Sequence, residues 1–272
     1  MHTTDQGTGE LPRGVAQIPG TFFRNPTHGE ALARLHYLAD QRRSLGILSG
    51  ASGSGKTTVL AEFERQLRCT ARPAATVNLV GQEAREFLWS LAAELGASPE
   101  LGDARHVLWR RVSDRVEQNH LDGTATVLLL DDADRAARGT LVQVERIVKT
   151  YAEKVTVILG ADVRRVGCLG SELLELSQLR IALEPWDKHD VRAFLDAVIE
   201  RSSGRTPRFD DGATARLSEL SGGTPRWVSH LAELAVLAAQ SRGRDRIDAE
   251  TIESVYLELS DTYADAGIPV TA

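Results

Sequence analysis

The amino-acid sequence predicts an α/β fold, in which a parallel sheet is sandwiched by helices, followed by a small all-helical domain. As far as residue 185, short and almost continuously apolar segments alternate with segments of helical periodicity. Strands that are apolar along their whole length are typical of a parallel sheet whose two faces are both covered by helices. Beyond residue 185, helical periodicity continues without strand-like segments, which indicates a separate helical domain.

The strand-like segments are short and largely apolar, and the one at residues 155–159 is also rich in β-branched residues. We expect them at residues 45–49, 75–80, 126–130, 155–159 and 180–183. Helices are expected between them, at residues 56–67, 82–95, 106–118 and 133–150. A first helix precedes the first strand, and its expected start is Thr27, because Thr27 and Glu30 form a capping-box pair.

The second part of the chain shows four segments of helical periodicity, with no strand expected between them. They lie at residues 190–201, 211–220, 225–239 and 249–259. The chain is therefore predicted to have four parts, and the two terminal ones are tails. These parts are an N-terminal tail at 1–20, an α/β domain at 21–185, a helical lid domain at 186–260 and a C-terminal tail at 261–272.

Composition places the chain among ordinary globular proteins. Of its 272 residues, 42% are hydrophobic and 26% are charged, and the formal net charge is -6. An acidic balance argues against polyanion binding over the whole surface but leaves a local basic patch open. The two cysteines, Cys69 and Cys168, are far apart and form no metal-binding spacing. Without a signal peptide or an apolar run of about 20 residues, the sequence predicts a cytoplasmic protein with no transmembrane segment.

Residues 50–57 fit the pattern G-x-x-x-x-G-K-[ST], with an apolar strand before them and a helix after them. Glycines let the backbone bend so that successive N–H groups bind phosphate oxygens, and the N-terminus of the next helix adds partial positive charge. Lys56 would reach the β- and γ-phosphates, and the Thr57 hydroxyl would bind Mg²⁺. The sequence therefore predicts a site for ATP with Mg²⁺. The nucleotide-binding residues expected from this segment are Gly50, Ser52, Gly53, Ser54, Gly55, Lys56, Thr57 and Thr58.

Two aspartates end the strand expected at residues 126–130. Carboxylates directly after a buried strand are costly unless they have partners, and a Mg²⁺ held by the phosphate loop is such a partner. Asp131 is the candidate metal ligand with Thr57, and Asp132 is the candidate base that orients the attacking water. Alternatively, the two aspartates cap the helix that follows.

The order of these features resembles that of the AAA+ ATPases, which are P-loop NTPases. Within them, the chain is similar to general-secretion-pathway A-type ATPases and to transposition helper ATPases. The resemblance covers about residues 21–260. The residues that carry it are Phe22, Phe23 and Pro26 before the first helix, Leu48, Ser49 and Gly50 at the loop, Val157, Ile158, Leu159 and Gly160 in the fourth strand, and Gly222, Gly223, Thr224, Pro225 and Arg226 in the helical domain.

Arg226 has an unusual position on the predicted helix. Thr224 suits an N-cap and Pro225 the first helical position, so Arg226 falls in the first turn, where the helix dipole disfavours a positive charge. Such a conflict with local preference is typical of functional sites. The resemblance implies that Arg226 contacts the γ-phosphate, as the sensor-2 arginine of the family does. A solvated arginine is the alternative.

The resemblance implies two further site positions. A polar sensor residue is expected just after the fourth strand, where Asp162 is the candidate. An arginine finger would come from a neighbouring subunit, and the candidates are Arg164, Arg165 and Arg180. The family thus implies a nucleotide-dependent homo-oligomer. It also implies a partner, which is an unidentified protein or DNA.

The favoured interpretation is an AAA+ ATPase that hydrolyses Mg-ATP to drive a conformational switch acting on a partner. The alternative is a nucleotide-gated signalling module with slow or no hydrolysis, because signalling relatives of AAA+ proteins often end this strand in two aspartates. A small-molecule kinase would use the same loop, but the helical domain does not suggest an acceptor pocket. The client of the protein stays open at this stage.

Overall fold

A computed structural model describes residues 23–201 and 206–265 of the chain. The chain divides into two compact units. The first unit, Arg24–Pro185, is the α/β unit, and the second, the helical unit, combines Phe23 with the described residues from Trp186 onward. The predicted N-terminal tail at residues 1–20 lies outside the described residues.

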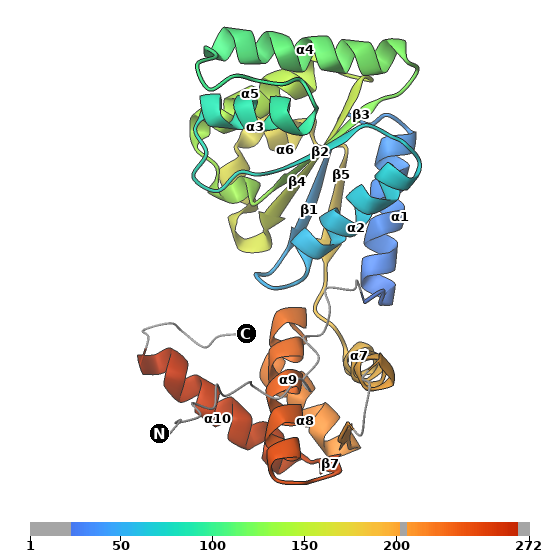
Figure 1. The fold of residues 1–272 in the computed structure, drawn as a ribbon, viewed down its shortest axis with the longest axis vertical. Helices are drawn as coiled ribbons and strands as arrows, with labels where there is room; N and C mark the ends of the chain where they lie inside the picture. Colours follow the sequence, from blue (N-terminus) through green and yellow to red (C-terminus); the bar gives the residue numbers. More distant parts are fainter. Residues whose placement is uncertain (1–22, 202–205, 266–272) are drawn as a thin grey trace, which may run out of the picture. The chain divides into compact units, whose positions relative to one another are not determined.

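The α/β unit is built on a parallel sheet of five strands in the order β2-β3-β4-β1-β5 (Figure 1). The predicted fold class is therefore confirmed. The strands are β1 (Leu45–Gly50), β2 (Ala74–Asn78), β3 (Thr126–Asp131), β4 (Val155–Asp162) and β5 (Leu179–Leu183). Because all five strands are parallel, their carboxyl ends lie at one edge of the sheet, where loops after the strands commonly form binding sites.

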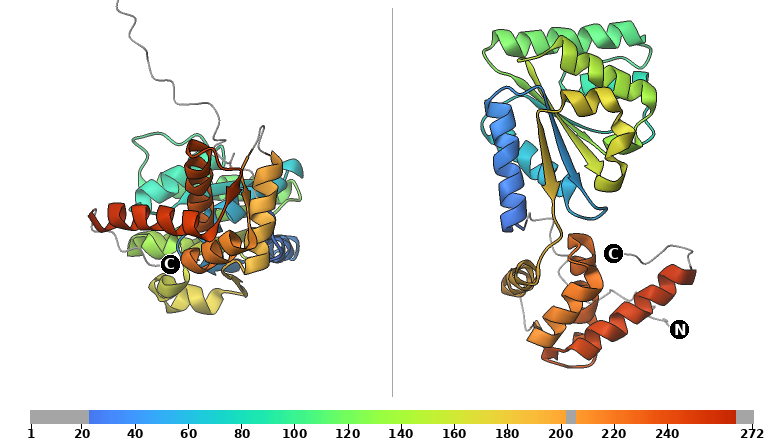
Figure 2. Two further views of the ribbon diagram at one scale, coloured as in Figure 1. Left: turned by 90° about the horizontal axis from the view of Figure 1, so that it is seen from below. Right: turned by 180° about the vertical axis from the view of Figure 1, so that it is seen from behind.

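Helices cover both faces of this sheet, as Figures 1 and 2 show. One face is covered by α1 (Pro26–Asp40) and α2 (Lys56–Cys69), and the other by α3 (Ala84–Glu94), α4 (Arg105–Leu121) and α5 (Arg138–Thr150). The short helices η1 (Ala133–Arg135), η2 (Val163–Leu169) and α6 (Ser171–Leu176) complete the unit. The sequence pattern did not indicate η2 or α6, because each is too short to repeat a helical period.

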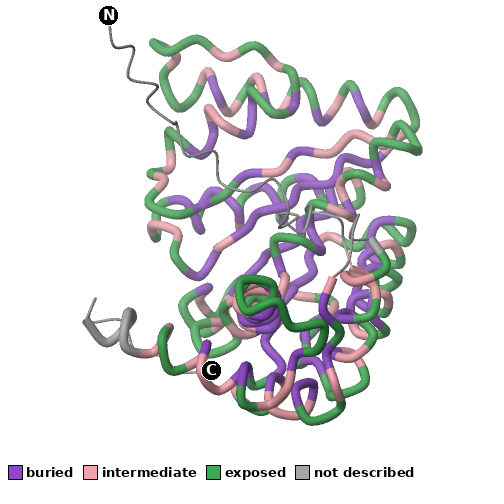
Figure 3. Tube along the Cα trace, turned by 60° about the horizontal axis from the view of Figure 1, so that its bottom comes forward, coloured by how far each residue is buried: buried purple, intermediate pink, exposed green. Residues whose placement is uncertain are grey.

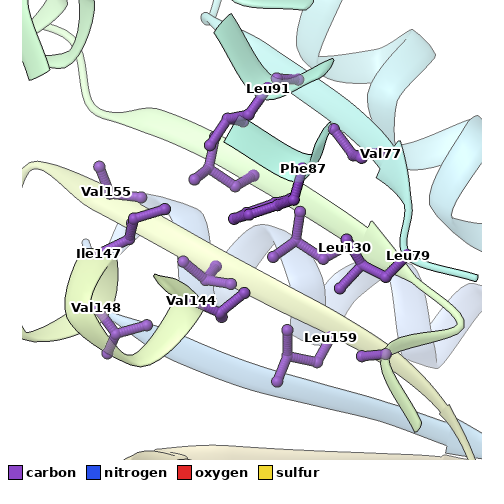
Figure 4. Close-up of a cluster of buried hydrophobic side chains, with 14 of the residues drawn as sticks. Val77, Leu79, Phe87, Leu91, Leu130, Val144, Ile147, Val148, Val155 and Leu159 are labelled. Atoms are coloured by element: carbon purple, nitrogen blue, oxygen red, sulfur yellow. The ribbon is translucent and has the colours of Figure 1, made fainter. Parts of the chain in front are cut away.

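Burial on both faces explains why the central strands are apolar throughout. The strands β1, β3 and β4 are buried along nearly their whole length (Figure 3). In β4, Val155 and Leu159 face the cluster that contains Phe87 of α3 and Val144 of α5 (Figure 4). Ile158 points to the opposite face, where it approaches Gly46 of β1. Each such side chain contributes about 1.5–3 kcal/mol when it is fully buried.

Helix α1 begins one residue earlier than predicted. Its N-cap is Asn25, whose side-chain oxygen accepts a hydrogen bond of 2.9 Å from the N–H of His28. Pro26 occupies the first helical position, where its missing N–H costs nothing and its fixed φ suits the helix. The expected cap at Thr27 is therefore wrong, because Asn25 with Pro26 starts the helix first and places Thr27 inside it.

The helix predicted at residues 133–150 is interrupted. It is divided into η1 and α5, with Ala136 and Ala137 in extended conformation between them. Asp134 of η1 accepts a hydrogen bond of 3.1 Å from the N–H of Asp162, so η1 is tied to the end of β4. This contact between residues distant in sequence overrides the helical preference of the continuous segment.

The helical unit contains the four predicted helices. They are α7 (Lys188–Arg201), α8 (Asp211–Ser221), α9 (Pro225–Ser241) and α10 (Ala249–Asp265). A parallel pair of two-residue strands, β6 (Arg208–Phe209) and β7 (Arg246–Ile247), accompanies them, so the expectation of no strand is wrong here. Two residues are too few to show a strand period.

Helix α10 continues to Asp265, into the C-terminal tail predicted at residues 261–272, of which residues 266–272 lie outside the described part. None of the helices in the described part of the chain combines the length and the apolar content that crossing a membrane requires.

An aromatic cluster and a close backbone contact hold the helical unit together. The ring of Phe23 lies 5.4 Å from the rings of both Trp186 and Phe194, centroid to centroid. The N–H of Trp186 donates a hydrogen bond of 2.8 Å to the carbonyl of Gly223. Gly223 has φ of 68°, and a Cβ there would clash with the carbonyl oxygen of Trp186. Glycine is therefore required at this position both for its backbone conformation and for its lack of a side chain.

We expect Gly223→Ala to lower the free energy of unfolding by about 2–4 kcal/mol, because it adds a clash with Trp186 to the strain of a positive φ. Gly243→Ala is the matched control, since Gly243 has φ of 63° but no neighbouring atom within 4 Å of the added Cβ. The control should cost only about 1 kcal/mol. Urea unfolding of both variants tests this, and equal losses would contradict it.

Candidate functional site

The segment between β1 and α2 forms a bent loop of the predicted kind. The strand ends at Gly50, the helix begins at Lys56, and Gly53 and Gly55 have φ of 82° and 94°. L side chains rarely adopt such φ values, so the two glycines make the bend possible. Gly55 is the N-cap of α2, and the first N–H groups of that helix therefore belong to the loop.

The loop is closely packed upon itself. A Cβ on Gly50 would clash with Ser54, which is buried, and the N–H of Ser54 donates to the carbonyl of Ala51 at 3.1 Å. The Lys56 side chain is also buried, and its Nζ donates hydrogen bonds of 3.0 Å to the carbonyls of Gly50 and Ala51. The structure thus holds the lysine ammonium against the start of the loop. Ser52 and Thr58, by contrast, are exposed.

Thr57 and Asp131, the two predicted metal ligands, are brought into contact. The Thr57 hydroxyl donates a hydrogen bond of 2.5 Å to Oδ2 of Asp131. Asp131 is only 4% exposed, and its Oδ1 accepts a hydrogen bond of 2.9 Å from the N–H of Asp132. A hydroxyl beside a buried carboxylate is an all-oxygen donor set of the kind that Mg²⁺ prefers.

Strand β4 lies between β3 and β1 and leaves room for this contact. A Cβ on Gly160 would lie 2.5 Å from Oδ1 of Asp131 and 3.3 Å from Cδ1 of Leu60. Gly160 therefore lets the carboxylate pass over the intervening strand. The sequence resemblance included Gly160, but the reason for a glycine there becomes visible only when the strand order is known.

Asp132 lies directly after β3 in the left-handed conformation, with φ of 52° and ψ of 37°. Its Oδ2 accepts a hydrogen bond of 2.9 Å from Nδ2 of Asn78, and Oδ1 of Asn78 accepts one of 2.9 Å from the N–H of Val80. Asp132 makes no side-chain cap hydrogen bond to η1, so the alternative of a helix cap does not account for its side chain.

Asn78 is the site residue that sequence reasoning missed. It is the last residue of β2 and pairs with Asp131 in the sheet register. A polar residue at the carboxyl end of a strand was the available signal, but the sequence does not show which strands are neighbours. The expected strand, residues 75–80, also ran past this position.

Asp162 lies beside the phosphate loop, since it pairs with Gly50 in the register of β4 and β1. Its Oδ1 accepts a hydrogen bond of 2.9 Å from the N–H of Arg164, and the Arg164 guanidinium lies 3.3 Å from the same oxygen. Burial alone would raise the pKa of Asp162, but the hydrogen bonds from Arg164 and the charges of Arg164 and Lys56 hold that pKa below its ordinary value. Asp162 therefore belongs to the same electrostatic environment as Lys56.

The three candidate arginine fingers are exposed, and each has a partner within the chain. Arg164 pairs with Asp162, and Arg165 pairs with the buried Asp134 at 3.3 Å. Arg180 of β5 donates a hydrogen bond of 3.0 Å to the carbonyl of Leu174. The structure of one chain does not distinguish among them, and the arginine finger stays a prediction.

Arg226 belongs to the helical unit and is not among the residues that the α/β unit brings together. Within its own unit it occupies the predicted place, because α9 begins at Pro225 with Thr224 as the N-cap. Thr224 makes no side-chain cap hydrogen bond, and Arg226 is exposed in the first turn. Its contact with a nucleotide stays a prediction.

The comparison with known protein families agrees with this arrangement. Residues 39–161 match the family described as AAA domain. Together with the parallel sheet and the loop, this match supports the likeness of the α/β unit to the AAA+ P-loop proteins. The resemblance predicted from the sequence is thereby confirmed at the level of this class.

Individual relatives give a more specific likeness. General secretion pathway protein A of Aeromonas hydrophila is 27% identical over 267 residues, which cover 96% of this chain and 49% of that protein. The chain thus spans about half the length of this curated relative.

Among solved structures, the Aeropyrum pernix ORC1 protein in complex with DNA has a TM-score of 0.66 at 20% identity and covers 89% of this chain and 67% of its own. The Thermotoga maritima RuvB Holliday junction branch migration motor has a TM-score of 0.57 at 17% identity, covering 85% and 69%. These two likenesses concern the fold.

We expect Asp162→Asn to lower the free energy of unfolding by roughly 0.5–1 kcal/mol at pH 7, because Arg164 is exposed and solvent screens the pair. The pKa of Asp162 is lower in the folded state than the unfolded value of 3.8, so its carboxylate stabilises the fold fully above that value. This stabilisation is lost as pH falls through the lower folded value. The difference from wild type should therefore shrink as pH falls below about 4.

Urea unfolding at pH 7 and at acid pH measures this effect. In an Arg164→Gln background, Asp162→Asn should have a smaller effect, because the partner charge is already absent. A difference that persists unchanged at acid pH would contradict the assignment.

Proposed function

We propose that this protein is an ATPase that binds Mg-ATP at the loop of residues 50–57 and hydrolyses its terminal phosphate. The contact between Thr57 and Asp131 is the observation that carries the proposal, because a hydroxyl and a buried carboxylate meet beside the loop at 2.5 Å. Members of the AAA+ class are typically ATPases, which supports the assignment.

The residues of the loop would bind the triphosphate. Backbone N–H groups of Gly53, Gly55 and the first turn of α2 would contact phosphate oxygens, and the Lys56 ammonium would leave its carbonyl partners to reach the β- and γ-phosphates. Thr57 and Asp131 would hold Mg²⁺, which neutralises charge on the phosphate oxygens when it is bound.

Asp132 would accept the hydrogen bond of the attacking water, and the hydrogen bond from Asn78 fixes the orientation of its carboxylate. Asp162 lies beside Gly50 in the sheet and would serve as the polar sensor residue for the γ-phosphate. Arg226 would add a positive charge to the γ-phosphate when the helical unit closes on the nucleotide. Hydrolysis would then remove the γ-phosphate and with it the contact to Arg226.

We infer that this movement acts on a partner and occurs within a nucleotide-dependent homo-oligomer, with Arg164, Arg165 or Arg180 serving a neighbouring site. The sequence likeness to a general secretion pathway protein supports a protein partner, and the fold likeness to a structure solved with DNA makes DNA the second candidate. Turnover measured with and without duplex DNA distinguishes the two partner classes.

We expect Lys56→Ala to reduce ATP turnover about hundredfold or more, because it removes the positive charge closest to the loop. It should also weaken the binding of Mg-ATP in calorimetry. Lys149→Ala is the control, since Lys149 forms an exposed pair with Glu145 on α5 and lies outside the loop. Equal turnover of wild type and Lys56→Ala would contradict the ATPase assignment.

We expect Asp132→Asn to reduce turnover about 10²- to 10⁴-fold while the Kd for Mg-ATP changes less than about threefold, because a base acts on the water and not on nucleotide binding. Single-turnover hydrolysis and calorimetry measure the two effects. If the wild type binds tightly but shows no turnover, even with partners, the protein is instead the nucleotide-gated signalling module considered from the sequence.

A further inference from the structure

A buried histidine of α1 contacts the backbone of the phosphate loop. His28 lies in the first turn of α1 and is only 4% exposed. Its Nε2 lies 3.2 Å from the carbonyl oxygen of Ser54. The same ring also packs against the next residue, because a Cβ on Gly55 would lie 3.1 Å from Nε2 and 3.2 Å from Cε1. The imidazole therefore contacts two consecutive residues of the loop.

The partner at Ser54 determines which ring nitrogen carries a proton. A carbonyl oxygen only accepts hydrogen bonds, so Nε2 of His28 must be the donor in this contact. The hydrogen bond joins residues that are 26 positions apart in sequence. Nothing in the loop motif itself requires a histidine at this distance.

The contact sets the orientation of one peptide group in the loop. The carbonyl of Ser54 and the N–H of Gly55 belong to the same planar trans peptide, and the two groups point in opposite directions. Because the carbonyl points to His28, the Gly55 N–H points away from α1. Gly55 has φ of 94°, and glycine tolerates many backbone conformations, so this peptide has little intrinsic resistance to turning.

Helix α1 is well placed to hold the ring still. Asn25 caps the helix at the N–H of His28 itself, which fixes the turn that carries the imidazole. Farther along, α1 packs closely on the sheet, since any Cβ on Gly46 of β1 would clash with Leu38. The position of His28 is therefore set by a capped helix that packs on the sheet and not by a surface loop.

From this geometry, we propose that His28 is a positioning residue for the phosphates of the nucleotide. By holding the Ser54 carbonyl, it keeps the Gly55 N–H turned toward the phosphate side of the loop before the nucleotide arrives. A pre-oriented donor strengthens binding because no free energy is spent on reorienting it. The inference rests on the proposed function, and it concerns the binding of the phosphates rather than the chemical step.

The substitution His28→Leu removes the donor while it keeps apolar volume. We expect it to raise the Kd for Mg-ATP, measured by calorimetry, about tenfold, the loss expected for one pre-oriented hydrogen bond. The KM for ATP should rise by a similar factor, with kcat at saturation within about threefold of wild type. His28→Gln should restore most of the affinity, because the glutamine amide nitrogen stands at the position of Nε2.

His36 provides the matched control on the same helix. Its Nε2 lies 2.7 Å from Oε1 of Gln66, so its hydrogen-bond partner belongs to α2 and not to the loop. His36→Leu should leave the Kd within about twofold of wild type even if it lowers thermal stability. If His28→Leu fails to fold, His28→Asn replaces it, because the shorter amide stays polar but does not reach Ser54.

The outcomes separate this inference from the proposed function. If wild type binds Mg-ATP, Lys56→Ala does not, and His28→Leu binds like wild type, then the positioning role is wrong and the ATPase assignment stands. The role is also wrong if His28→Gln is as weak as His28→Leu, or if His36→Leu weakens binding equally. If wild type produces no heat of binding with millimolar Mg-ATP, the proposed function itself fails.

Discussion

The hydrogen bond between Thr57 and Asp131 is the constraint around which the α/β unit is organised. It joins the first turn of α2 to the end of β3, 74 positions apart in sequence. A buried carboxylate is costly unless its oxygens are hydrogen-bonded, and both oxygens of Asp131 accept such bonds. The carboxyl ends of β1 and β3 must therefore lie at the same edge of the sheet, which a parallel arrangement provides.

The strand order makes this constraint more demanding. Strand β4 separates β3 from β1, so the carboxylate of Asp131 has to pass over a neighbouring strand to reach the loop. Gly160 makes this possible because a side chain there would occupy the space of Oδ1. The absence of a side chain at one position of β4 thus allows the carboxylate at the end of β3 to reach the phosphate loop.

The loop is supported from two sides by residues that the motif does not contain. Asp162 at the end of β4 lies beside Gly50 and shares the electrostatic environment of Lys56. His28 from α1 contacts Ser54 and Gly55. A glycine-rich backbone has many accessible conformations, and such external contacts select one of them. Both supports lie outside the loop motif itself and reach the loop through the packing of β4 and α1.

The sequence by itself determined the fold class, the loop and the acidic strand end, because apolar periodicity, a spaced glycine–lysine motif and adjacent aspartates are local patterns. It misplaced the start of α1 and joined η1 to α5, since the cap at Asn25 and the contact between Asp134 and Asp162 compete with local preference. Only the tertiary structure decided that Asn78 contacts Asp132, that Gly160 makes room for Asp131 and that His28 reaches Ser54. Each of these joins residues far apart in the chain. The order of the strands, which no local pattern encodes, brings the first two together, and the packing of α1 brings His28 to the loop.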